Sequence, residues 1–182
     1  SGGDQPMTDP HIWLSPLLAQ KITDNILAGF IAADPLHHAD YEARAVVLKT
    51  KLADLDREYR EDLRNCRGKN IITSHAAFGY LAAEYGLNQI GIVGLSPDAE
   101  PSAGDMARII EFAKKNRVET IFFESLMSPK LSETIAREIG ARVLPLNPIE
   151  GLTGEEIARG ENYFTVMRSN LNNLHRGLVC TP

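Results

Sequence analysis

The sequence predicts an α/β protein in which a long linker helix precedes a four-stranded parallel sheet flanked by helices. Two observations lead to this fold class. From residue 70 onward, short apolar runs alternate four times with amphipathic stretches, and such alternation is typical of a parallel sheet with helices on both faces. Before it, residues 38–65 carry one narrow apolar stripe, at steps of three and four residues, in an otherwise charged segment, which indicates a helix.

The N-terminal part of the chain predicts two helices. Ser15-Pro16 is typical of a helix N-cap followed by proline at the first helical position. An apolar stripe then continues until Asp34-Pro35, and the residue before a proline is disfavoured in a helix. We therefore expect one helix over residues 16–33. The second, over residues 38–65, would be roughly 42 Å long at 1.5 Å per residue, which indicates a strut between two lobes.

The C-terminal part predicts four strands, each followed by a helix. The expected strands cover residues 70–73, 89–93, 118–123 and 142–146. The first three expected helices cover residues 76–85, 102–116 and 130–139. A closing helix is expected from about Thr153 or Gly160 to His175, with Ile157 facing the core. Gly86 and Gly140 directly follow two of the helices, where glycine is favoured because it tolerates positive φ.

Polar side chains follow three of these strands. His75, Glu124 and Glu150 come after the first, third and fourth strands. The carboxyl ends of parallel strands lie at one edge, where open α/β sheets bind ligands, so we expect the three side chains to face one crevice. A simpler alternative for His75 is an ordinary strand-to-helix turn in which Ser74 is the N-cap.

His11 lies in a turn between two prolines and is a further candidate. Two imidazoles and a carboxylate, here His11, His75 and Glu150, suit a borderline divalent ion such as zinc. The spacings are 75 − 11 = 64 and 150 − 75 = 75, so no local motif marks the site. His11 could equally be a surface histidine and Glu150 part of an exposed turn.

Glu124 follows an apolar run and should be at least half buried, so its carboxylate needs a partner. That partner is either the N–H of a ligand histidine, which would fix the ring, or a salt bridge or helix cap. The sequence has no G-x-G-x-x-G, P-loop, G-x-S-x-G or H-E-x-x-H motif. Dinucleotide sites, P-loops, serine-hydrolase elbows and helical metalloprotease sites are therefore unsupported.

Composition excludes two further classes. A formal net charge of −5 and a pI near 5.5 argue against a nucleic-acid-binding protein, and no apolar run approaches the ~20 residues that span a membrane. Cys66 and Cys180 lie 180 − 66 = 114 residues apart. They are either two free thiols or one disulfide, and the disulfide would imply an oxidising compartment.

The ordered set of these segments resembles the zinc/manganese solute-binding proteins of bacterial ABC importers, the TroA-like helical-backbone metal receptors. The matching segments are residues 9–16 (DPHIWLSP), the helix after Asp34-Pro35, residues 74–80 (SHAAFGY) with 84–87 (EYGL), and residues 99–102 (AEPS), 122–124 (FFE) and 146–152 (LNPIEGL). The likeness covers nearly the whole chain.

This resemblance implies a function and a ligand set. His11 and His75 match two ligand histidines of the family, and Glu150 matches its C-terminal carboxylate ligand. Manganese-selective members carry glutamate where this chain has His75, so zinc is expected rather than manganese. The resemblance implies an extracytoplasmic metal-binding component of an ABC importer, not an enzyme, that hands Zn2+ to a membrane permease. The implied location is periplasmic or extracellular, with anchoring through an N-terminal segment outside this sequence.

The family has two similar lobes, and residues 1–10 cannot form the first. We therefore expect residues 1–36 to be the remnant of the N-terminal lobe that carries one ligand histidine. Residues 37–67 would be the rigid interlobe helix, and residues 68–182 the C-terminal metal-binding α/β lobe. The missing lobe should supply another histidine ligand, which leaves the site in this chain open and weaker.

Two other functions are compatible with the same residues. An open site of two histidines and one carboxylate also describes a catalytic zinc site, so a metal-dependent hydrolase is the alternative, with Glu124 as its only evident general base. A third hypothesis is a metal-free, adhesin-like binding lobe.

Overall fold

The computed structural model describes residues 8–96, 98–124 and 128–181. The helices are α1 (Pro16–Ala33), α2 (His38–Asp62), α3 (Gly79–Glu84), α4 (Ala103–Lys115), α5 (Lys130–Ile139), α6 (Gly154–Ala158) and α7 (Tyr163–Gly177), with 3₁₀ turns η1 (Ile12–Leu14) and η2 (Pro35–His37). The strands are β1 (Asn70–Thr73), β2 (Asn88–Gly91), β3 (Thr120–Phe123) and β4 (Arg142–Pro145). Residues 1–7 of the expected N-terminal remnant, and residues 97, 125–127 and 182 of the expected C-terminal lobe, lie outside the described part.

The four strands form one parallel sheet in the order β2-β1-β3-β4, which confirms the predicted fold class. Ile72 of β1 pairs with Ile121 of β3, and Phe123 of β3 pairs with Pro145 of β4. In this register the carboxyl ends of β1, β3 and β4 lie at the same edge. The turns that carry the candidate residues therefore start side by side.

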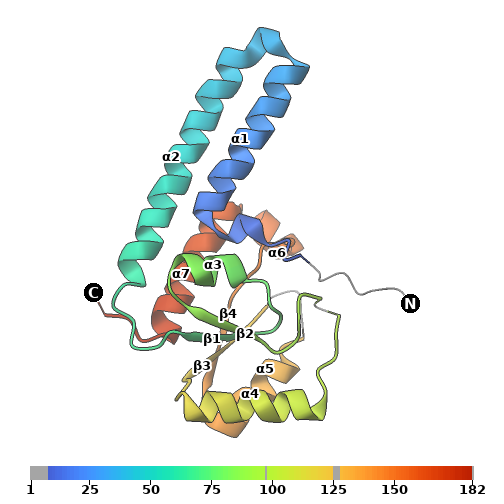
Figure 1. Cartoon of the computed structure of the whole chain (residues 1–182), viewed down its shortest axis with the longest axis vertical. Coiled ribbons are helices and arrows are strands. Elements are labelled where there is room, and N and C mark those ends of the chain that lie inside the picture. The colour runs from blue at the N-terminus through green and yellow to red at the C-terminus, as the bar shows by residue number, and fades with distance from the viewer. Residues whose placement is uncertain (1–7, 97, 125–127, 182) are drawn as a thin grey trace.

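Alternate side chains of the strands enter two separate cores, because successive residues of a strand point to opposite faces. Ile71 lies in the core that β1 shares with α2, α3 and α7, whereas Ile72 lies in the core with α4 and α5. Figure 1 shows α4 and α5 on the side of the sheet opposite to α3 and α7. Residues 68–181 thus form a three-layer α/β body.

Helices α1 and α2 form a hairpin that projects from this body (Figure 1). Leu55 and Tyr59, in the half of α2 nearest the sheet, are fully buried, and burial of such side chains contributes about 1.5–3 kcal/mol each. In the projecting part, Ile26, Phe30 and Val46 keep more than half of their surface exposed. The predicted apolar stripe of residues 16–33 is therefore only partly buried. None of the helices in the described ranges is long and apolar enough to cross a membrane.

The turn after β1 is longer than predicted, because α3 starts at Gly79 rather than at residue 76. The N–H of Ala76 donates to the carbonyl of Gly94 (3.0 Å), so a distant loop satisfies the backbone of this turn. Ser74 is not the N-cap of α3, and within the described residues its buried hydroxyl has no hydrogen-bond partner. The simple capped-turn alternative for His75 is wrong.

The single closing helix that the apolar spacing predicted is two helices, α6 and α7. Thr153 and Asn162 each form a capping box at the start of one of them, and these two start signals divide the segment. Ile157 lies in the short helix α6 and is 64% exposed, so its predicted inward orientation is wrong. At the other end of the chain, the turn between two prolines that carries His11 continues into the short 3₁₀ turn η1.

Cys66 and Cys180 form a disulfide in the structure. The bond joins the segment between α2 and β1 to the C-terminal tail, and the backbone of Arg67 and Gly68 also bonds to the carbonyls of Val179 and Leu178. The tail that follows α7 is thereby attached to the start of the sheet.

We expect the double substitution Cys66→Ser/Cys180→Ser to lower the free energy of unfolding by about 2–4 kcal/mol, because the disulfide restricts the unfolded chain. Urea unfolding followed by circular dichroism measures this difference. Reduced parent protein should unfold with the stability of the variant, and the variant should not respond to reductant. Equal stability of the oxidised parent and the variant would contradict the bond.

Candidate metal centre

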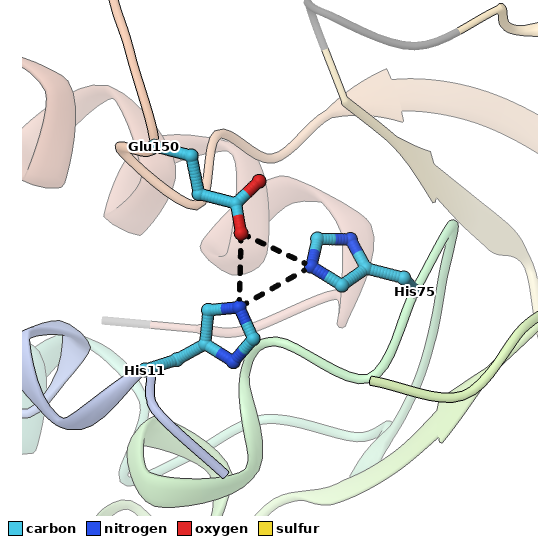
Figure 2. Close-up of side chains that lie close together, drawn as sticks. All are labelled: His11, His75 and Glu150. Atoms are coloured by element: carbon cyan, nitrogen blue, oxygen red, sulfur yellow. Dashed lines mark hydrogen bonds and ion pairs between the residues drawn. The ribbon is translucent and has the colours of Figure 1, made fainter. Parts of the chain in front are cut away.

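The structure brings His11, His75 and Glu150 together although they lie far apart in the sequence (Figure 2). Nε2 of His11 lies 3.0 Å from Oε1 of Glu150 and 3.4 Å from Nε2 of His75. Nε2 of His75 lies 3.5 Å from the same Glu150 oxygen. The three side chains therefore point at one common position from three separate segments.

His75 is held by the turn that follows β1. Its carbonyl accepts hydrogen bonds from the hydroxyl of Thr73 (2.7 Å) and the side-chain amide of Gln89 (3.2 Å). The end of β2 passes this turn so closely that a Cβ on Gly91 would lie 2.9 Å from the backbone N of Ala76, so only glycine fits there. The His75 side chain is fully buried.

Glu124, at the end of the neighbouring strand β3, orients the ring of His75. Its two carboxylate oxygens lie 2.8 and 2.7 Å from Nδ1 of His75, and Oε1 also accepts the backbone N–H of His75 (3.0 Å). This hydrogen-bond network assigns the ring proton to Nδ1 and leaves Nε2 as a free lone pair. Of the two roles open to Glu124 from sequence, the structure shows the contact with the histidine ring.

The charge around His75 also changes its acidity. Burial lowers the pKa of this imidazole, but the carboxylates of Glu124 and Glu150 outweigh burial and raise the pKa above its usual value. His75 therefore holds a second proton more strongly than a free imidazole does.

Asp9 orients the ring of His11, just as Glu124 orients the ring of His75. Its Oδ1 lies 2.7 Å from Nδ1 of His11 and accepts the backbone N–H of His11 (2.9 Å). Asp9 is not among the site residues predicted from sequence. An aspartate two residues before the histidine, in a turn that contains proline, is the pattern of an Asx-turn, and that pattern could have indicated the contact.

The segments that carry His11 and Glu150 are tied to each other outside the site. The indole N–H of Trp13 donates to the carbonyl of Pro148 (2.8 Å), and the hydroxyl of Tyr163 donates to the carbonyl of Trp13 (2.8 Å). Trp13 also packs beside the ring of His11. These contacts fix the separation between the N-terminal turn and the loop after β4.

The backbone immediately before Glu150 is strained. Ile149 has φ +58°, a left-handed conformation that costs a residue other than glycine about 1–2 kcal/mol. The backbone N–H of Ile149 donates to Oδ1 of Asn147 (2.7 Å), which stabilises this conformation. Such outliers concentrate at functional sites, and neither Ile149 nor Asn147 was identified from sequence.

The converging atoms have a defined chemistry. With Nδ1 of both rings hydrogen-bonded to carboxylates, the two Nε2 atoms and Oε1 of Glu150 face one another as lone pairs, so a proton or a metal cation is needed between them. Ligand atoms about 2.0–2.1 Å from a tetrahedral zinc ion stand about 3.3 Å apart. The observed separations of 3.0, 3.4 and 3.5 Å fit such an ion.

The site is closed on the histidine side and open on the side of Glu150. His11 and His75 are at most 2% exposed, whereas one third of the Glu150 side chain is exposed. A further ligand or a partner molecule would therefore approach past Glu150.

Comparisons with known proteins show which family the chain resembles. The family model "ZnuA: Zinc-uptake complex component A periplasmic" matches residues 1–177. The high-affinity zinc uptake system protein ZnuA of Bacillus subtilis (strain 168) is 46% identical over 171 residues, which are 94% of this chain and 54% of that protein. The zinc-binding lipoprotein AdcA of Streptococcus pneumoniae (strain ATCC BAA-255 / R6) is 45% identical over 166 residues, 91% of this chain and 33% of that protein.

Solved structures are similar as well. The crystal structure of the laminin-binding protein Lbp of Streptococcus pyogenes superposes with a TM-score of 0.86 at 36% identity, over 95% of this chain and 69% of that one. The Zn(II)-bound ZnuA-like domain of Streptococcus pneumoniae AdcA superposes with a TM-score of 0.80 at 42% identity, over 97% of this chain and 68% of that one.

The chain spans about half the length of the Bacillus subtilis relative and about a third of the AdcA proteins. Because the family model covers residues 1–177 of 182, the chain belongs to the ZnuA family, the periplasmic component A of zinc-uptake complexes.

Proposed function

We propose that the protein is the extracytoplasmic zinc-binding component of an ABC importer, which captures Zn2+ and hands it to a permease in the membrane. The observation that carries the proposal is the spacing of the three ligand atoms. Their separations of 3.0–3.5 Å are those of atoms around one zinc ion, about 3.3 Å apart. The names of the relatives, a zinc uptake protein and zinc-binding lipoproteins, support the same metal.

The donor set favours zinc over manganese. His11 and His75 supply two imidazole nitrogens and Glu150 one carboxylate oxygen. Imidazole suits zinc, whereas manganese is bound best by oxygen ligands. The carboxylates of Asp9 and Glu124 behind the two rings add negative charge, which attracts a divalent cation.

Zinc usually takes four ligands, and the described part of this chain supplies three. We place the fourth outside the described residues, as a histidine of an N-terminal lobe that approaches the open side at Glu150. In this arrangement residues 1–36 complete that lobe, residues 37–67 link the lobes, and residues 68–182 form the C-terminal lobe. As the zinc-binding component of an importer, the protein is placed in this proposal in the periplasm or outside the cell, with anchoring to the membrane.

The geometry does not favour the hydrolase alternative. The general base suggested for it was Glu124, but both oxygens of that carboxylate contact the ring of His75. The carboxylate is also 2% exposed, so it is not placed to activate water. We therefore assign Glu124 to positioning the ring, in a protein that releases its cargo without a chemical step.

Removal of one ligand should abolish tight binding. We expect His75→Ala to weaken zinc binding by more than about 100-fold, because loss of even the outer partner of a ligand costs 10–100-fold. Calorimetric titration of the metal-free protein measures the affinity, and the zinc-dependent rise of Tm should disappear with it. His37→Ala, at an exposed histidine in the hairpin turn, is the control. An unchanged single site in His75→Ala would contradict the proposal.

The orienting role of Glu124 predicts a smaller effect. Glu124→Gln keeps the shape of the side chain but replaces a charged acceptor by a neutral one, which forms a weaker hydrogen bond. We expect zinc binding to weaken by about 10-fold or more, as measured by competition with a chromophoric zinc chelator. Glu100→Gln, at an exposed carboxylate, should bind like the parent. Parent-like affinity of Glu124→Gln would exclude this role.

Zinc affinity should fall as the pH is lowered, because zinc must displace the second proton of His75. The raised pKa of His75 means that this proton is bound at pH values where an ordinary imidazole, with a pKa of about 6.5, is neutral. The decline should therefore begin above that value. Chelator competition at a series of pH values measures it, and Glu124→Gln should move the decline to lower pH. A constant affinity across the range would contradict the assignment.

A further inference from the structure

A pair of buried asparagines lies between helix α7 and the loop that carries Glu150. Oδ1 of Asn170 accepts the backbone N–H of Asn147 (2.8 Å), and Nδ2 of Asn170 donates to the carbonyl of Asn147 (2.7 Å). Asn170 is 2% exposed and Asn147 is 7% exposed. One side-chain amide of α7 thus binds both backbone groups of a single loop residue.

From these contacts we propose that Asn170 and Asn147 are positioning residues for the metal ligand Glu150. The inference rests on the proposed zinc site and extends it to a helix that contributes no ligand. Asn170 lies 23 residues after the residue that it holds, so no local motif links it to the site.

The contacts form a continuous path from α7 to the carboxylate. Asn170 fixes the backbone of Asn147, and the side chain of Asn147 in turn accepts the N–H of Ile149 (2.7 Å). That bond holds Ile149 at φ +58°, a conformation that a β-branched residue does not keep without support. Glu150 is the next residue, so a change of φ at Ile149 would swing the carboxylate away from the histidines.

Glu150 needs this backbone support more than the other two ligands do. The rings of His11 and His75 are each oriented by a carboxylate. Among the described residues, the Glu150 carboxylate has hydrogen-bonding or ionic contacts only with those two rings. The position of the Glu150 carboxylate before metal binding is therefore set by the backbone. Asn170 and Asn147 hold that backbone, as Asp9 and Glu124 hold the two histidine rings.

Helix α7 also supplies a matched control. Nδ2 of Asn173 donates to the carbonyl of Pro145 (3.0 Å), so Asn173 also ties α7 to the end of β4. This bond lies before the strained loop and does not touch Asn147 or Ile149. A purely structural role of the α7 contacts would make Asn170 and Asn173 equivalent.

The test compares Asn170→Asp with Asn173→Asp. Aspartate at position 170 keeps the acceptor for the N–H of Asn147 but sets a carboxylate oxygen against its carbonyl. We expect zinc binding to weaken by about 10-fold, the loss typical of an outer partner of a metal ligand, mainly through faster dissociation. Asn173→Asp should bind zinc like the parent. Chelator competition and stopped-flow release measure affinity and rate, and urea unfolding without metal measures stability.

A double-mutant cycle with Glu150→Gln separates positioning from general destabilisation. If Asn170 acts through the carboxylate, Asn170→Asp should cause little further loss of zinc affinity in the Glu150→Gln background. The same 10-fold loss in both backgrounds, or an equal loss in Asn173→Asp, would overturn the inference while leaving the proposed function intact. Absence of zinc binding by the parent would overturn both.

A second pair of variants serves if Asn170→Asp does not fold. Asn147→Asp keeps an oxygen that accepts the N–H of Ile149, whereas Asn147→Ala removes it. We expect Asn147→Ala to lose about 10-fold in zinc affinity and Asn147→Asp to stay close to the parent. Equal affinity of the two variants would overturn the role of the Asn147 side chain.

Discussion

The hydrogen bonds from the two Nδ1 atoms to the carboxylates of Asp9 and Glu124 are the interaction on which the candidate metal centre depends. Asp9 and Glu124 each bind a ring and the backbone N–H of the same histidine. They thereby fix the tautomer, so that both Nε2 lone pairs face the same position. Without these carboxylates, a ring could rotate or carry its proton on Nε2, and the convergence seen in Figure 2 would be lost.

The rest of the fold brings these pairs within reach of each other. Parallel pairing of β1 with β3, and of β3 with β4, places His75, Glu124 and the loop to Glu150 at one edge of the sheet. His11 comes from outside the sheet, and the bond from Trp13 to Pro148 joins its turn to the Glu150 loop. The sheet thus positions His75 and Glu150, whereas the hydrogen bond from Trp13 to Pro148 positions His11.

Much of the fold was predictable because its signals are local. The bounds predicted for β1 (Asn70–Thr73) and α5 (Lys130–Ile139) match the structure, and Gly140 ends α5 in the left-handed conformation. The predictions failed where tertiary contacts replace local ones. The helix after His75 begins late because Gly94 and Glu124 accept the N–H groups of its turn.

In the site, too, features with local signals were predictable and features set by tertiary contacts were not. The grouping of His75, Glu124 and Glu150 followed from the order of strands and turns, which a parallel sheet converts into proximity. The contacts that Asn147 makes with Asn170 could not be predicted, because they depend on how α7 lies against the end of β4. The strained backbone at Ile149 could not be predicted from sequence either, because isoleucine rarely adopts a positive φ.

The long sequence separations within the site would connect the proposed zinc binding to folding. His11 lies 64 residues from His75 and 139 residues from Glu150, so an unfolded chain rarely brings the ligands together, since long loops are entropically unfavourable. The native topology must form first, and parallel strand pairing is an intrinsically slow, non-local step. If the proposed site binds zinc, nascent chains have little means of sequestering the ion, and occupancy of the site would report that a molecule has completed its folding.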